Sequence, residues 1–271
     1  MPHEFITLRH PVEKLLEAEY FLVRMVGSNS LEFQFELNAF LSASRSVSFV
    51  LQKAMSDVPG FAVWYGERRL SMKADAAMGF FLELRNISQK QGPVSFVGGS
   101  LLGGGWTYRF LGWPKEVPQS LIGRDIGACC AEHLSKLAKL ILGCCEAFPY
   151  HSCPAQAFTE DGMVALGYSM EDAEVAVGLP PGWTDVVDFP ISEKLRWLRR
   201  EIEPLDVDSI KRLAVADIRG NGSPLKFPVS NGTDLVDDIA EGAATPEGNN
   251  SNARANFLNA IVTRIARDGR P

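Results

Sequence analysis

An arginine, an asparagine and a lysine stand close together in the segment ELRNISQK, residues 83–90, at the end of an apolar periodic stretch. The guanidinium of Arg85 can hold a phosphate by a charged fork and stabilise charge that develops on it. A lysine ammonium such as that of Lys90 also binds phosphate, but it acts as a base near neutral pH only after strong desolvation. The segment therefore predicts phosphate chemistry, with Arg85, Asn86 and Lys90 as the catalytic candidates.

This segment and the helices predicted before it resemble the HEPN superfamily over roughly residues 10–93. HEPN domains are small helical bundles, usually dimeric, and many are metal-independent ribonucleases. Their signature is an arginine and a polar residue, followed four to six residues later by a histidine that can act as acid or base. Arg85 and Asn86 match the first two places, but Lys90 stands at the nearest histidine position and residues 91–94 contain no histidine.

The resemblance implies a homodimer in which two Arg85–Lys90 segments face one cleft. Because the histidine is replaced, Lys90 favours a phosphate binder, or an altered enzyme, over an ordinary HEPN ribonuclease. Arg85 would hold the phosphate, Asn86 would orient the segment and Lys90 would add a second phosphate contact. Any surviving activity would be metal-independent RNA cleavage, and the sequence predicts no metal or other cofactor.

A polar stripe on the preceding long helix predicts binding residues for the same cleft. Asn38, Ser42 and Arg45 fall at i, i+4 and i+7, and Gln89 shares a helix face with Arg85. If the two helices pack antiparallel, Arg45 and Arg85 point into one cleft.

A structural interpretation of these residues stays open beside the functional one. Asn38 and Ser42 would then face solvent, and Arg45 would make a surface ion pair. Arg85 would pair with a neighbouring carboxylate, for which Asp75 and Glu83 are the candidates.

Apolar periodicity and Gly or Pro breaks predict a mainly α protein. We expect an antiparallel, HEPN-like helical bundle over residues 1–93 and a smaller α+β region over 94–271 that packs on it or forms a second unit. The expected elements are helices at 11–26, 30–56 (with Ser30 as its N-cap), 61–70, 72–90, 123–147, 192–203, 206–216 and 253–267, a β-hairpin within 94–113, irregular chain over 150–190 and a flexible loop at 241–252.

Other groupings of reactive or charged residues have simpler explanations. The adjacent pairs Cys129–Cys130 and Cys144–Cys145 lie on one predicted helix and cannot chelate, so core packing of reduced thiols is expected. The basic residues of 194–200 are flanked by glutamates at 193, 201 and 203, which favours a solvated helix face over a patch that guides RNA. The tryptophans at 106, 113 and 183 could stack on bases, although core or interface packing is the more usual role.

The composition is that of an ordinary globular protein, with 46% hydrophobic and 22% charged residues and a net charge of -6. This charge gives no global attraction to nucleic acid or to an anionic membrane, so RNA contact needs a local basic patch. No signal peptide or membrane helix is apparent, and we expect a cytoplasmic protein without a membrane partner.

Three functions are compatible with the sequence. The first is RNA or nucleotide phosphate binding at an Arg85/Lys90 cleft, with absent or altered ribonuclease activity and RNA as the partner. The second is a non-catalytic, dimerising protein-interaction module. The third is a small-molecule pocket beside the hairpin that carries Trp106. Unpaired basic residues would favour the first, and neutralisation by Asp75, Glu83 or Glu36 would favour the second.

Overall fold

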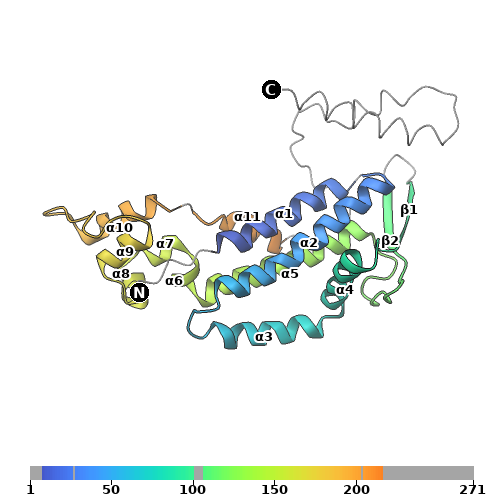
Figure 1. Ribbon diagram of the computed structural model, residues 1–271, viewed down its shortest axis with the longest axis horizontal. Coiled ribbons are helices and arrows are strands. Elements are labelled where there is room, and N and C mark those ends of the chain that lie inside the picture. The colour runs from blue at the N-terminus through green and yellow to red at the C-terminus, as the bar shows by residue number, and fades with distance from the viewer. Residues whose placement is uncertain (1–7, 27, 101–105, 203, 216–271) are drawn as a thin grey trace, which may run out of the picture. The chain divides into compact units, whose positions relative to one another are not determined.

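The computed structural model describes residues 8–26, 28–100, 106–202 and 204–215 (Figure 1). These residues form a mainly helical fold with a two-stranded antiparallel hairpin, as the sequence predicts. In chain order the elements are α1 (Arg9–Met25), α2 (Ser30–Ala54), α3 (Phe61–Ala74), α4 (Ala76–Lys90), β1 (Phe96–Ser100), β2 (Trp106–Phe110), α5 (Ile126–Ala147), α6 (Pro149–Ser152), α7 (Pro154–Ala157), α8 (Glu160–Leu166), α9 (Met170–Ala176), α10 (Ile191–Arg200) and α11 (Val207–Val215).

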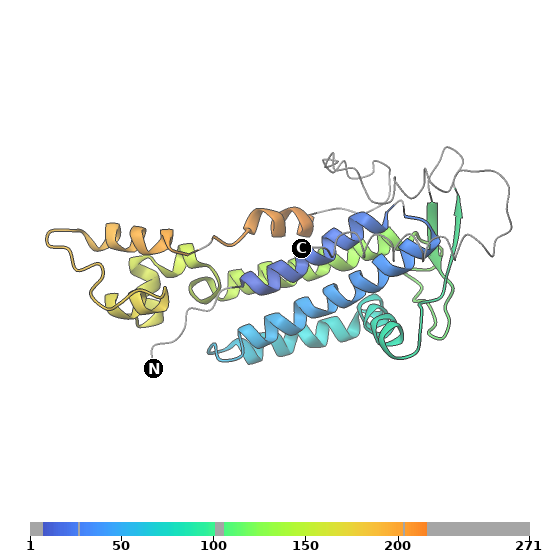
Figure 2. The same cartoon turned by 45° about the horizontal axis from the view of Figure 1, so that its top comes forward.

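The main core lies between α1, α2 and α5, which run side by side in Figures 1 and 2. Spacings of three and four residues place the apolar side chains of α1 and α2 on one face of each helix. Asn29, one residue before the predicted Ser30, caps α2 by accepting hydrogen bonds from the amides of Leu31 and Glu32.

Asp75 separates α3 from α4, where the sequence predicted a single break near residue 71. Its carboxylate accepts a hydrogen bond from the Met78 amide and starts α4, so α3 continues to Ala74. The same carboxylate pairs with Lys136 on α5 at 2.7 Å. This ion pair ties the start of α4 to the middle of α5.

The hairpin packs on the bundle core, which therefore continues past residue 93. Phe96 pairs with Phe110 and Ser100 with Trp106 across the strands. The Tyr108 ring stacks on Phe33 of α2 with centroids 3.7 Å apart, and its hydroxyl donates to the Ser28 carbonyl at 2.9 Å. Residues of the hairpin and of α5 belong to the same hydrophobic core as those of α1 and α2.

The close approach of Gly98 to Tyr108 makes a testable steric prediction. A Cβ atom on Gly98 would lie 2.4 Å from the Tyr108 ring, which the Phe33 stack and the Ser28 hydrogen bond hold in place. We expect Gly98→Ala to lower the free energy of unfolding by about 2 kcal/mol, the usual scale for overpacking. Gly99→Ala is the control, because its Cβ meets no atom within 4 Å. Equal denaturation midpoints for the two variants would contradict the expectation.

Residues 149–200 contain five helices, of which α6 to α9 lie within 149–176, so the expectation of irregular chain over 150–190 was wrong for 150–176. Pro149 and Pro154 each stand at the start of a four-residue helix, where a missing amide proton costs nothing. These helices surround a second, smaller core made by Ala157, Phe158, Met163, Ala173, Leu195 and Leu198.

The helix α11 returns to the main core and packs against α5. The Ser135 hydroxyl donates to the Ala214 carbonyl at 3.1 Å, and Arg212 forms an ion pair with Glu19 of α1.

The predicted loop 241–252 and helix 253–267 lie outside the described residues. No helix in the described ranges is long and apolar enough to cross a membrane.

Candidate functional site

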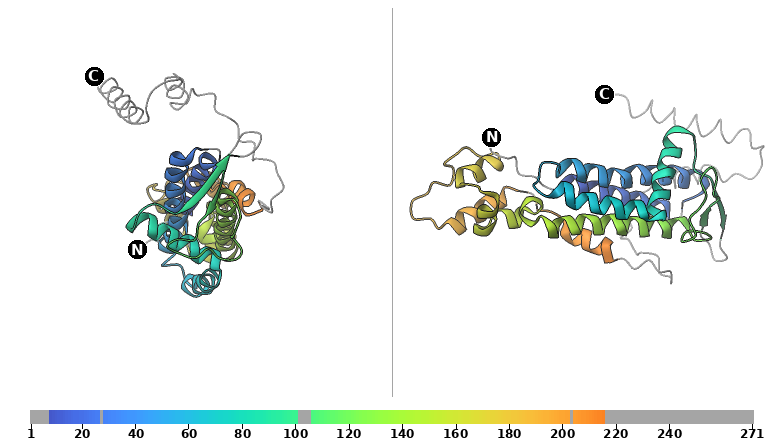
Figure 3. Two further views of the ribbon diagram at one scale, coloured as in Figure 1. Left: turned by 90° about the vertical axis from the view of Figure 1, so that its right-hand side faces the viewer. Right: turned by 90° about the horizontal axis from the view of Figure 1, so that it is seen from below.

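The helices α2 and α4 were predicted to contact each other, and one pair of candidate residues makes such a contact. The Gln89 amide donates to the Ser42 hydroxyl at 3.2 Å, although the two residues are 47 positions apart. The helices do not pack antiparallel, because α4 crosses α2 steeply in both views (Figures 1 and 3). Only a short part of α4 therefore contacts α2, and the shared polar surface is smaller than an antiparallel pair would give.

The other stripe residues on α2 bond to neighbours on their own helix. The Asn38 side chain accepts a hydrogen bond from Gln34 at 3.1 Å. Arg45 donates to the Ser48 hydroxyl at 2.8 Å and is exposed. The surface ion pair considered for Arg45 is absent from the described residues.

The three motif residues lie on the last turns of α4. Arg85 is half-buried, and its Nε atom is inaccessible and without a hydrogen-bond partner among the described residues. Asn86 is half-buried as well, whereas Lys90 is exposed at the C-terminus of the helix, where a cation complements the helix dipole.

Two of the three carboxylates that could neutralise these cations are engaged elsewhere. Asp75 pairs with Lys136, and Glu36 pairs with Arg24 at 2.7 Å. Glu83 is exposed and makes no ion pair within the described ranges. The structural interpretation of Arg85 as a partner of Asp75 therefore does not hold.

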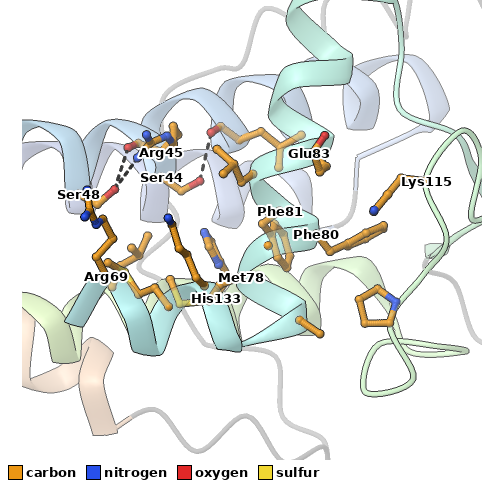
Figure 4. A pocket seen from close by; sticks show the side chains of 18 of the residues that line it. Ser44, Arg45, Ser48, Arg69, Met78, Phe80, Phe81, Glu83, Lys115 and His133 are labelled. Carbon is orange, nitrogen blue, oxygen red and sulfur yellow. Dashed lines mark hydrogen bonds between the residues drawn. The ribbon is translucent and has the colours of Figure 1, made fainter. Parts of the chain in front are cut away.

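A large pocket opens beside this surface, between α2, α3, α4, α5 and the loop 115–122 (Figure 4). Its volume is about 920 Å³, which is at the upper end of the usual range for small-molecule sites. Arg45 is the only predicted site residue that lines it; Arg85, Asn86, Lys90, Asn38, Ser42 and Gln89 do not. The candidate residues are thus divided between the pocket and the surface formed by the end of α4.

Two arginines gather at one side of the pocket, near the buried Tyr65. Arg45 comes from α2 and Arg69 from α3, and Figure 4 shows both beside Ser48. Burial raises the pKa of Tyr65, and the positive charges of Arg45 and Arg69 oppose this rise. Neither arginine makes an ion pair in the described ranges. Reasoning from sequence missed Arg69, for which the adjacent arginines 68 and 69 were the only signal.

The other side of the pocket is aromatic. His133 of α5 is 8% exposed and stacks on Phe81 of α4 with ring centroids 4.3 Å apart and 14° between planes. Burial lowers the pKa of His133 to about 3, and the charge of Lys136 lowers it further than Asp75 raises it. The imidazole is therefore neutral at physiological pH, and its buried Nδ1 has no partner in the described chain. By sequence alone, His133 is one histidine on a helix rich in cysteine and leucine, which is typical of an ordinary core or surface position.

The remaining sequence candidates lie elsewhere. Cys129, Cys130 and Cys144 are buried, and burial raises the pKa of Cys129 to about 11 and that of Cys144 to about 12, so they pack as neutral thiols. Within the basic helix α10, Arg196 pairs with Glu193. Trp106 and Trp183 are exposed, and Trp113 is 75% exposed, so core packing was the wrong expectation for these side chains.

Fold and site together define a mainly helical protein with a basic and aromatic pocket. Part of the chain, residues 26–100, matches the family described as bacteriophage lambda protein ea47. Protein ea47 of Escherichia phage lambda is 34% identical over 63 residues, which are 23% of this chain. The similar segment spans only 15% of the phage protein's length. No solved structure matches this chain.

Proposed function

We propose that this protein binds the phosphates of RNA or nucleotides at the surface of α4 that carries Arg85 and Lys90, without ordinary ribonuclease activity. The observation that carries this proposal is that Arg85 and Lys90 have no ion-pair partner in the described ranges, while Asp75 and Glu36 are engaged by Lys136 and Arg24. Unpaired guanidinium and ammonium groups gain more from a phosphate than groups that must first leave a carboxylate.

The contact between Ser42 and Gln89 supports the same surface, because it links α2 to the end of α4. Arg85 supplies the phosphate fork, and its unpartnered Nε can donate one of the two hydrogen bonds after a small rotation of the side chain. Lys90 adds a point charge at the helix end. The replacement of the HEPN histidine by Lys90 removes the group that titrates near neutral pH, so binding is proposed and efficient cleavage is not.

The test is binding and cleavage of a labelled single-stranded RNA without metal, by the wild type and by Arg85→Gln, Lys90→Ala and Lys90→His. We expect Arg85→Gln to weaken binding at least about tenfold, because a charge-assisted contact is lost. Lys90→Ala should lower the slope of log K against log salt by about 0.7, the value for one phosphate contact on a single strand. Lys90→His should keep binding and gain cleavage.

The control is Arg109→Ala, which removes the same charge from an exposed position on β2. Circular dichroism of each variant separates lost binding from lost folding. If the wild type binds no RNA at any salt concentration, the proposal is wrong. Sedimentation of the same samples then tests the alternative, a dimerising module, which requires a dimer without RNA binding.

A further inference from the structure

We propose that the pocket between α2, α3, α4 and α5 binds a small aromatic anion, with its acidic group on Arg45 and Arg69 and its ring beside His133 and Phe81. This site goes beyond the proposed phosphate-binding surface, because Arg85 and Lys90 do not line it. Its ligand is a free small molecule with a flat ring and a carboxylate or phosphate group.

The basic side of the pocket specifies the acidic group. Arg45 and Arg69 come from different helices, yet both charges act on the buried Tyr65 hydroxyl. Holding two guanidinium groups near each other without a carboxylate is unfavourable, and a bound anion relieves this repulsion. The Tyr65 hydroxyl already donates to the Ser48 carbonyl, which fixes this wall before a ligand arrives. Lys73 and Lys115 add further positive charge at the lining, against Glu83 and Glu116.

The aromatic side specifies a flat, apolar body. His133 and Phe81, both labelled in Figure 4, are stacked and buried. Leu41 and Leu137 also line the pocket. A neutral imidazole is compatible with an uncharged ring, and an aromatic ring packs on such a stack better than a puckered aliphatic ring.

Matched pairs of variants can test the basic side of the pocket and the open space inside it. Arg69 lines the pocket, whereas the adjacent Arg68 lies over the Trp64 ring, 5.4 Å from its centroid, and does not line it. Gly79 of α4 lines the pocket, and a Cβ there meets no atom within 4 Å, so a leucine would fill open space. Gly66 of α3 has an equally open Cβ position but does not line the pocket.

The experiment is calorimetric titration of the full chain with 2-naphthoate and with 2-naphthyl phosphate. Two related compounds serve as ligand controls. The first, 2-naphthamide, lacks the negative charge, and the second, decahydro-2-naphthoate, lacks the flat ring. We expect binding of one or both aromatic anions, and at least about tenfold weaker binding of each control. Comparison of the two anions shows whether the acidic group is a carboxylate or a phosphate.

We expect Arg69→Ala and Gly79→Leu to weaken the aromatic anion at least about tenfold, and Arg68→Ala and Gly66→Leu to leave its affinity unchanged. Two results would overturn the inference: binding of neither anion by the wild type, or equal affinity for 2-naphthoate and 2-naphthamide. Because these titrations contain no RNA, they decide the pocket independently of the phosphate-binding surface.

Discussion

Replacing Glu174 with glutamine should lower the free energy of unfolding of the second core by about 3 kcal/mol. Glu174 is buried on α9, and its two carboxylate oxygens accept hydrogen bonds from the segment that follows the helix. The amide of Gly182 donates to one oxygen at 2.5 Å, and the amide and hydroxyl of Thr184 donate to the other at 2.6 and 2.5 Å. A glutamine replaces one acceptor by a donor, so at least one buried amide loses its partner and faces another donor.

The contribution of the Glu174 carboxylate to stability should also depend on pH, in a direction that follows from its pKa shift. Burial raises the pKa of Glu174, but hydrogen bonds from Thr184, Gly182 and Trp183 lower it more, so the net shift is downward. The stability it contributes is therefore fully present above the pKa of the unfolded state and is lost as the pH falls through the lower pKa of the folded state. The glutamine variant should lack this part of the acid sensitivity.

The measurement is amide hydrogen exchange resolved by segment, together with denaturant unfolding. Glu174→Gln should accelerate exchange over residues 177–190, while α1, α2 and α5 keep their protection. Glu171→Gln is the matched control, since Glu171 lies on the same helix and is exposed. Unchanged exchange over 177–190 in Glu174→Gln would show that the carboxylate does not hold this segment.

The sequence predicts the long helices well because their apolar residues recur at three and four positions. Of the apolar residues at this spacing, Leu37, Phe40, Val47 and Leu51 on α2 and Phe80, Leu84 and Ile87 on α4 are buried, whereas Ala76 at the start of α4 is exposed. The ends of helices depend on single capping residues. Capping by Asn29 and Asp75 places the ends of the neighbouring helices one to four residues away from the predicted positions. The short helices α6 and α7 have four residues each, which is too few for any periodicity to appear.

The candidate site could be predicted only in part, because it depends on how helices cross. The two polar helix faces assigned to the cleft contact each other between Ser42 and Gln89. Arg45 and Arg85, which antiparallel packing was expected to bring into one cleft, are divided between the pocket and the end of α4. Same-face reasoning could not separate Arg69 from Arg68, which differ only by the 100° turn between successive helix residues. It also could not find the His133 stack on Phe81, because one histidine among cysteines and leucines is typical of an ordinary core helix. Crossing angles come from packing between distant segments, and no local pattern contains them.

Acidification from pH 8 to pH 5 should destabilise the protein through His133 by roughly 2 kcal/mol. Burial is the main reason that its folded-state pKa falls from 6.5 to about 3, and the Lys136 ammonium adds to it. Between these two values the unfolded chain binds a proton that the folded chain excludes. Stability is therefore fully present above pH 6.5 and falls by about 1.4 kcal/mol for each pH unit below it.

Substitution of His133 by phenylalanine should remove this fall of the free energy of unfolding with decreasing pH, while keeping a ring against Phe81. The measurement is the free energy of unfolding from urea titrations at pH 5, 6, 7 and 8, a range above the titration of most carboxylates. His10→Gln is the control, because His10 is exposed on α1 and its loss should leave the slope in place. A wild-type slope that survives in His133→Phe would assign the acid sensitivity to other groups. Loss of the slope would mean that His133 stays neutral in the folded pocket wall, as an aromatic surface for a ligand ring requires.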